Sequence, residues 1–159
     1  PTLEDLESDL IKAGFSKNES IDKSIGANSF WVRENCYMFI AKGQFARWVS
    51  WTEVGLATAG TATEQLVGHG KPALSLPGKG PQFTYNFAVR QSRLLGGAVV
   101  PCLTYKDFAD KLFFLLENQK LRQSIGKIGI ERMGPSGGSQ SLATLVLKLL
   151  VDCSVSQLP

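Results

Sequence analysis

The sequence is poor in the residues and patterns that mark several common classes of protein. It has a single histidine, His69, which excludes a histidine-based zinc site. Its three cysteines are widely spaced, without metal-ligand spacing, and predict reduced, mostly buried thiols in a cytoplasmic protein. No apolar run approaches the roughly 20 residues that span a bilayer, and no signal peptide is visible. The net charge of +3 is not gathered into a basic stripe, so nucleic acid is not indicated as a partner.

What is present is typical of a globular protein. The chain has 159 residues, of which 43% are hydrophobic, enough for one domain with a full core. We expect that domain to cover residues 1–153, with residues 154–159 as a frayed tail. The chain opens at Pro1 without an initiator methionine, and we expect it to be part of a longer protein.

The pattern of apolar runs predicts the fold class. Val54–Ala59 and Pro72–Leu76 are short apolar runs that flank a helical pattern of about two turns, which indicates a strand–helix–strand crossover. Such strands are buried on both faces and do not alternate. We therefore predict an α/β fold, a Rossmann-like parallel sheet of about four to six strands with helices on both faces. Cys36–Ala41 is predicted as a central strand of this sheet, and Ala98–Val100 as another strand.

Apolar spacing and capping residues predict the remaining elements. Phe30–Arg33 is predicted as an edge strand. Further helices are predicted at Thr2–Ala13, at Gln44–Trp51, at Tyr105–Glu117 with Thr104 as N-cap, at Leu121–Met133, and after Gly137-Gly138 with Ser139 as N-cap.

The turn at Gly60 is the first candidate for a binding site. Thr61 is predicted to be the N-cap of the following helix, and Glu64 to complete a capping box. A helix start at the carboxyl end of a parallel strand offers unpaired amides and a partial positive charge, which suit an anion. The amides of Gly60, Thr61 and Ala62 are therefore candidate anion ligands. The alternative is a well-capped helix that binds nothing.

A second candidate lies in the loop after Pro72–Leu76, which reads PGKGPQF and contains Lys79. A helix is predicted to start near Gln82, and Gln82 and Asn86 are four residues apart, so they share a helical face. Two carboxamides on one face can bind hydroxyl groups through paired hydrogen bonds. The alternative is that both side chains only face solvent.

These features together resemble a known family. The run AGTATEQLVGHGKPALSLPGKGPQFTYNFA resembles the nucleotide-sugar-binding domain of GT-B fold glycosyltransferases, above all lipid A disaccharide synthase and its cyanobacterial relatives. The shared features are a G-T at the end of a strand, a G-K-P before the next strand and a P-x-F-T after it. The similarity is best over Trp51–Gly97 and fades on both sides.

The resemblance implies roles for the candidate residues. Gly60 and Thr61 would lie near the donor diphosphate. In the family, an acidic residue usually holds the ribose of UDP. The resemblance places that position at Gln65, so a carboxamide replaces the carboxylate there, and Glu64 is the residue before it. Gln82 and Asn86 would contact sugar hydroxyls.

The resemblance also implies how the diphosphate is stabilised. The family acts without a metal or cofactor, which agrees with the lack of a DxD carboxylate cluster in this sequence. The leaving group would be stabilised by backbone donors and helix dipoles, assisted by Lys79 or Arg90.

The resemblance finally implies a parent protein and an activity. The parent would be an inverting glycosyltransferase of lipid A biosynthesis that moves a GlcNAc-type sugar from UDP to an acceptor hydroxyl. Its catalytic base and acceptor site would lie in an N-terminal domain missing from this chain, which would hold no catalytic residue and be inactive alone. The parent would be cytoplasmic and peripheral at the inner face of the membrane. Two alternatives stay open: a domain like UDP-GlcNAc 2-epimerase, against which the single His69 counts, and a non-catalytic α/β nucleotide-binding or interaction domain.

Overall fold

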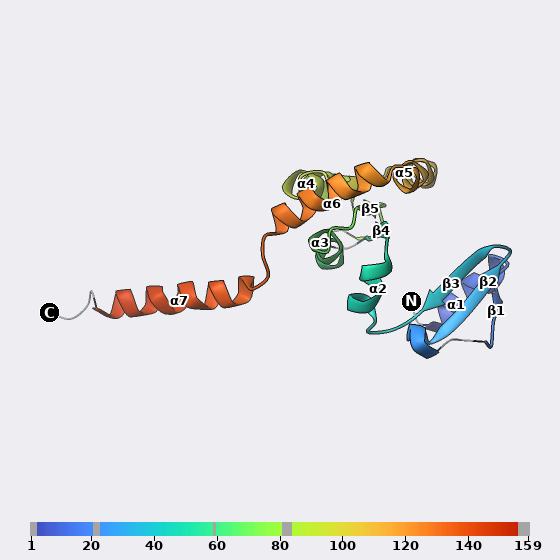
Figure 1. The fold of residues 1–159 in the computed structure, drawn as a ribbon, viewed down its shortest axis with the longest axis horizontal. Coiled ribbons are helices and arrows are strands. Elements are labelled where there is room, and N and C mark those ends of the chain that lie inside the picture. Colours follow the sequence, from blue (N-terminus) through green and yellow to red (C-terminus); the bar gives the residue numbers. More distant parts are fainter. Residues whose placement is uncertain (1–2, 21–22, 59, 81–83, 156–159) are drawn as a thin grey trace. The chain divides into compact units, whose positions relative to one another are not determined.

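The computed structural model describes residues 3–20, 23–58, 60–80 and 84–155. The chain divides into two compact units, which we call unit 1 (Pro1–Trp51) and unit 2 (Thr52–Pro159) (Figure 1). The interpretation of residues 1–153 as a single domain did not anticipate this division.

Unit 1 is an antiparallel sheet with a helix packed against it. Its elements in chain order are α1 (Leu3–Lys12), β1 (Ser16–Lys17), the 3-10 helix η1 (Lys23–Ile25), β2 (Ser29–Arg33), β3 (Cys36–Ile40) and α2 (Phe45–Trp51). The strand order is β1-β2-β3, and both pairings are antiparallel. Leu10, Phe15 and Trp31 form its buried core, so α1 packs on the sheet through Leu10.

The prediction of Cys36–Ala41 as a central strand of a parallel sheet is wrong. The corresponding strand β3 lies at the edge of the antiparallel sheet, and the side chain of Tyr37 is 61% exposed. The physical reason is the connection between β2 and β3. Only Glu34 and Asn35 separate the two strands, and so short a link forms a hairpin, whereas a parallel neighbour needs a crossover of a dozen residues or more.

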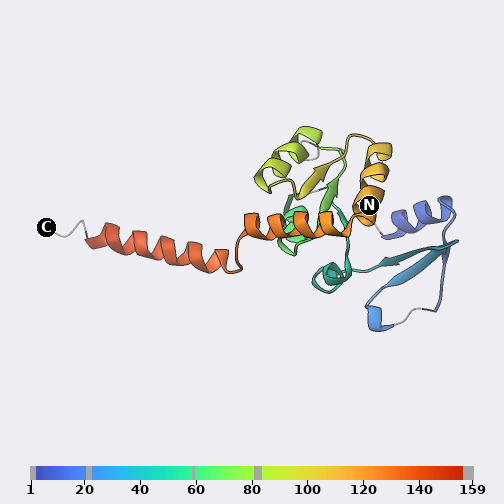
Figure 2. The same ribbon diagram turned by 45° about the horizontal axis from the view of Figure 1, so that its top comes forward.

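Unit 2 contains the predicted parallel sheet. Its elements are β4 (Gly55–Leu56), α3 (Gly60–Gly68), β5 (Ala73–Ser75), α4 (Tyr85–Leu94), β6 (Val99–Pro101), α5 (Tyr105–Glu117), α6 (Gln119–Met133) and α7 (Gly138–Val155) (Figure 2). The order is β4-β5-β6, with Leu56 paired to Leu74 and Leu74 to Val100. The α/β class and these three strands are confirmed, but the described residues form three parallel strands rather than four to six.

The central strand β5 supplies the middle of the core of unit 2. Leu74 is fully buried and packs in a cluster with Cys102 and Leu115, which brings α5 onto one face of the sheet. Burial raises the pKa of the Cys102 thiol, so this cysteine is protonated and unreactive at neutral pH. Successive strand residues point to opposite faces, so the buried Ala73 and Ser75 face away from this cluster.

Helices α3 and α6 touch through glycines. A Cβ placed on Gly126 would lie 2.1 Å from the carbonyl oxygen of Gly70, and a Cβ on Gly129 would lie 2.8 Å from a methyl group of Val67. Gly70 has φ +72, a conformation that favours glycine, and it follows the end of α3. The backbones therefore approach more closely than any other residue type allows.

The last helix differs from its prediction in detail. α7 begins at Gly138, so Ser139 lies inside the helix and is not its N-cap. The predicted tail also starts too early, because α7 continues to Val155, and of residues 154–159 only 156–159 lie outside the described ranges. Every side chain described in α7, over residues 138–151, is exposed. Among the helices that the structure describes, α7 included, none combines the length and apolar character needed to cross a membrane.

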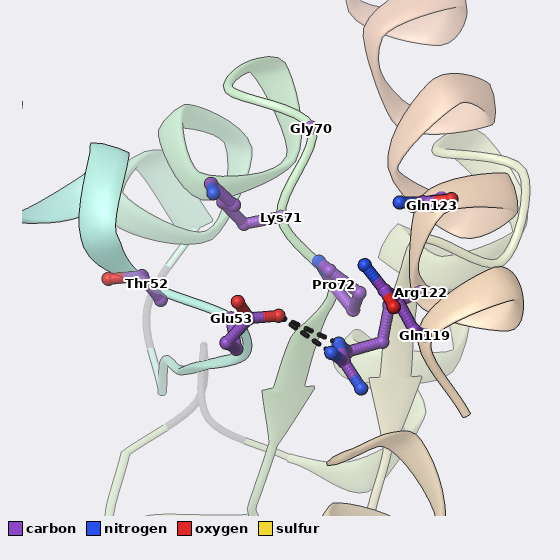
Figure 3. A pocket seen from close by; sticks show the side chains of 8 residues that line it. All are labelled: Thr52, Glu53, Gly70, Lys71, Pro72, Gln119, Arg122 and Gln123. Atoms are coloured by element: carbon purple, nitrogen blue, oxygen red, sulfur yellow. Dashed lines mark hydrogen bonds and ion pairs between the residues drawn. The ribbon is translucent and has the colours of Figure 1, made fainter. Parts of the chain in front are cut away.

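Arg122 joins α6 to two other parts of unit 2, and Figure 3 shows one of the two connections, its bonds to Glu53. Its guanidinium donates to Glu53 Oε2 at 2.8 and 2.9 Å, and to the carbonyl oxygens of Leu115, at 2.6 Å, and Leu116 at the end of α5. The Arg122 side chain is only 12% exposed, whereas Glu53 is 65% exposed. The bonds to the two carbonyls therefore matter more than the ion pair, which solvent screens.

We predict that Gly126→Ala lowers the free energy of unfolding by about 1–3 kcal/mol, because the new Cβ would strike the Gly70 carbonyl. Urea denaturation followed by circular dichroism measures this. Gly68→Ala is the matched control, because a Cβ there makes only ordinary contact with Met133, at 3.7 Å. A Gly126→Ala variant as stable as the unsubstituted protein would contradict the close contact.

We also predict that Arg122→Met lowers the free energy of unfolding by about 2 kcal/mol, because two carbonyl oxygens at the end of α5 lose their donor. Glu53→Gln should cost less than about 1 kcal/mol, since its carboxylate is exposed. Thermal and urea denaturation of both variants check this. Equal losses would show that the ion pair, and not the capping of α5, is the important interaction.

Candidate functional site

The carboxyl edge of the parallel sheet is where the predicted site residues gather. β4 ends at Leu56 and α3 begins at Gly60, while β5 ends at Ser75 and α4 begins at Tyr85. Because the strands are parallel, both helix starts follow strand ends at the same edge. The predicted residues Gly60, Thr61 and Ala62 open α3, and Asn86 lies in the first turn of α4.

The start of α3 is arranged differently from the prediction. The helix begins at Gly60, so Thr61 is the second helical residue and the predicted N-cap role of Thr61 is wrong. The capping box with Glu64 fails for the same reason, because its spacing was counted from Thr61. α3 has no acidic residue in its first turn. The amides at its start therefore meet no carboxylate from the first turn of α3, and the positive end of the helix dipole favours an anion there.

A buried glutamine ties α4 to the start of α3. Gln91 is 6% exposed, and its Nε2 donates to the carbonyl oxygen of Gly60 at 3.2 Å. A Cβ on Gly60 would have Gln91 Nε2 and Phe87 Cζ as its nearest atoms, both at 3.9 Å, which is ordinary contact. Sequence reasoning missed Gln91. Its signal was a polar residue three positions after Ala88 and four before Leu95, on the buried face of the helix.

The start of α4 is capped by a hydroxyl group. Thr84 is the N-cap, and its Oγ1 accepts a hydrogen bond from the amide of Phe87 at 3.2 Å. Asn86 is exposed in the first helical turn, and Lys79 is exposed in the loop before the helix. The predicted partner Gln82 lies outside the described residues, and the helix begins later than predicted, at Tyr85. The pairing of Gln82 with Asn86 stays a prediction.

The start of α5, after β6, already holds its own carboxylate. Thr104 caps the helix as predicted, and Asp107 Oδ2 accepts from the Leu103 amide at 2.8 Å and from Lys111 Nζ at 2.9 Å. The backbone hydrogen bond first, and Lys111 second, hold the pKa of Asp107 below its ordinary value. The positive end of α5 is thus occupied by the protein itself, which leaves the starts of α3 and α4 for a ligand.

Glu64 and Gln65 line a cavity beside α3. Both are exposed on the helix, and they line a cavity of about 470 Å³ whose other wall is Met133–Ser139, the end of α6 and the start of α7. His69 contributes to the floor of the same cavity. The two residues that the resemblance assigns to the ribose therefore lie on a hollow surface large enough for a nucleoside.

A second, smaller cavity lies at the opposite edge of the sheet (Figure 3). It has a volume of about 210 Å³ and contains Glu53, Lys71, Gln119, Arg122 and Gln123. Arg122 is held there by Glu53 and the end of α5, so its role is structural. Within residues 3–20, 23–58, 60–80 and 84–155, no group of three or more His, Cys, Asp or Glu residues is placed to hold a metal ion.

Comparison with protein-family models, with curated proteins and with solved structures finds no match for this chain.

Proposed function

We propose that unit 2 is the UDP-sugar-binding domain of a metal-independent, inverting glycosyltransferase, and that its sheet is Rossmann-like, the C-terminal half of a GT-B fold. The observation that carries the proposal is the start of α3. It lies a few residues after the parallel strand β4 and lacks an acidic residue in its first turn, while Gln91 fixes the Gly60 carbonyl. The resemblance in sequence over Trp51–Gly97 supports the same assignment.

The diphosphate of the donor binds at the amides of Gly60, Thr61 and Ala62, where unpaired donors and the helix dipole both favour negative charge. Glycine at position 60 allows the phosphates to come close to the backbone. The fold does not require it, because a Cβ there would have no neighbour closer than 3.9 Å. Room beside Gly60 thus favours a ligand role for this residue.

The other polar residues of the edge bind the rest of the donor. Gln65, or its neighbour Glu64, bonds the ribose hydroxyls from the next turn of α3. Asn86 in α4, with Gln82, reads the sugar hydroxyls, and Lys79 in the exposed loop before α4 assists the diphosphate. The sugar is of the GlcNAc type.

The reaction of the parent requires groups from a second domain. An acceptor hydroxyl attacks the anomeric carbon of the sugar with inversion, and UDP leaves, stabilised by backbone donors instead of a metal. The base that takes the acceptor proton belongs to an N-terminal domain of the same parent, which is the partner of unit 2. We place the parent in lipid A biosynthesis because the sequence resembles lipid A disaccharide synthase. For the same reason we place it in the cytoplasm, peripheral at the inner face of the membrane.

We predict that UDP binds the isolated chain at millimolar concentration and shifts amide resonances at residues 59–65 and 78–86. Gly60→Val should weaken the affinity for UDP at least about tenfold, because a β-branched side chain blocks the approach of the phosphates. Gly60→Ala should weaken it less and leave stability unchanged, because its Cβ meets no close atom. Titration followed by nuclear magnetic resonance measures both effects.

The control for this titration is Gln123→Ala, which alters the cavity at the opposite edge of the sheet and should leave UDP affinity unchanged. Absence of saturable shifts at millimolar UDP would contradict the proposal. Saturable shifts confined to residues 119–123 would also contradict it, because they would place the ligand at the wrong edge.

We predict that the 159 residues alone transfer no sugar from UDP-GlcNAc to lipid acceptors, because the base and the acceptor site lie in the partner domain. A radiolabelled-sugar assay at high protein concentration checks this, with the parent protein as the positive control. Robust turnover by the isolated chain would contradict the division of the site between two domains.

A further inference from the structure

We infer that the cavity between α3 and the segment Met133–Ser139 is the nucleoside subsite of the donor, and that this segment, which we call the α6–α7 loop, recognises the uracil ring. The inference rests on the proposed function and extends it, because sequence reasoning assigned no residue of this loop to the donor. It names the part of the chain that selects the base.

The direction of α3 leads from the diphosphate to this cavity. Thr61 and Gln65 are one turn apart on the same face of the helix, a rise of about 6 Å, close to the distance from a diphosphate to the hydroxyls of its ribose. Gln65 and Glu64 line the cavity, so a ribose that they bind has its base directed at the opposite wall.

The position of that wall is set by the packing of α6 on α3. Gly126 lies against Gly70 and Gly129 against Val67, so the end of α6 is carried along α3 toward its start. Met133 then lies next to Gly68, with its side-chain atoms 3.7–3.9 Å from a Cβ placed there. The cavity therefore lies between α3 and the end of α6, and residues 134–137 between α6 and α7 complete its second wall.

The loop has the chemistry that a pyrimidine requires. Gly134 and Gly137 have φ +74 and +104, and no atom lies within 4 Å of a Cβ placed on either. A flat ring can therefore approach this backbone. The Gly134 amide bonds the Ile130 carbonyl and the Gly137 carbonyl accepts from the Ser141 amide, so it is the other carbonyl and amide groups of residues 134–137 that complement the alternating acceptors and donor of uracil. Met133, 40% exposed, and Pro135 offer apolar surface to the face of the ring.

Two probes separate this subsite from the diphosphate site: inorganic pyrophosphate and UDP, each titrated into the full chain and followed by amide resonances. Pyrophosphate should shift residues 60–65 and the loop at Lys79 but not residues 133–139, and UDP should also shift residues 133–139. Met133→Ala should weaken the affinity for UDP by roughly three- to tenfold, because the apolar contact with the ring is lost. It should leave the affinity for pyrophosphate unchanged. Ile130→Ala is the matched control, an exposed apolar residue of the same helix outside this cavity, and should change neither affinity.

The outcomes distinguish the two proposals. Saturable UDP binding without shifts at residues 133–139 overturns the nucleoside subsite and leaves the proposed function standing. A folded Met133→Ala variant with unchanged UDP affinity does the same. Failure of both UDP and pyrophosphate to bind overturns the proposed function and this inference together. If Met133→Ala does not fold, the shifts of the unsubstituted chain still decide the question.

Discussion

The contact between the backbones of α3 and α6 is the constraint on which unit 2 depends. Gly126 and Gly70 meet so closely that no side chain fits between them, and Gly129 lets α6 come down on Val67. This contact fixes α6 along α3, and α6 in turn holds the end of α5 through Arg122. The cavity lined by Glu64 and Gln65 exists because α6 ends beside α3.

The three helix starts that follow the parallel strands have different chemistry, although their position in the fold is the same. At the start of α5 the Asp107 carboxylate accepts a hydrogen bond from the Leu103 amide, and the start of α4 is capped by the Thr84 hydroxyl. The start of α3 has no acidic residue in its first turn, and Gln91 holds its Gly60 carbonyl. An anion bound there would therefore meet donors already in place, without competition from a carboxylate of the same turn.

The described part of α7 gives a physical reason to expect a partner for this chain. Its side chains over residues 138–151 are all exposed, and most of them from Leu142 to Val151 are apolar. A helix that is apolar on most sides is usually covered in the assembled protein. This agrees with the proposal that unit 2 works beside another domain.

The sequence by itself determined the elements whose signals are local. The strands near Val54 and Pro72, the Thr104 cap and the helix ending at Met133 follow from apolar runs, a capping hydroxyl and a stopping glycine, which act over a few residues. The two-residue link between β2 and β3 is also a local signal, for a hairpin. Only the tertiary structure decided that Gln91 reaches Gly60 and that the Met133–Ser139 segment closes the cavity at Gln65. These depend on pairing and packing between residues far apart in the chain, which local periodicity does not encode.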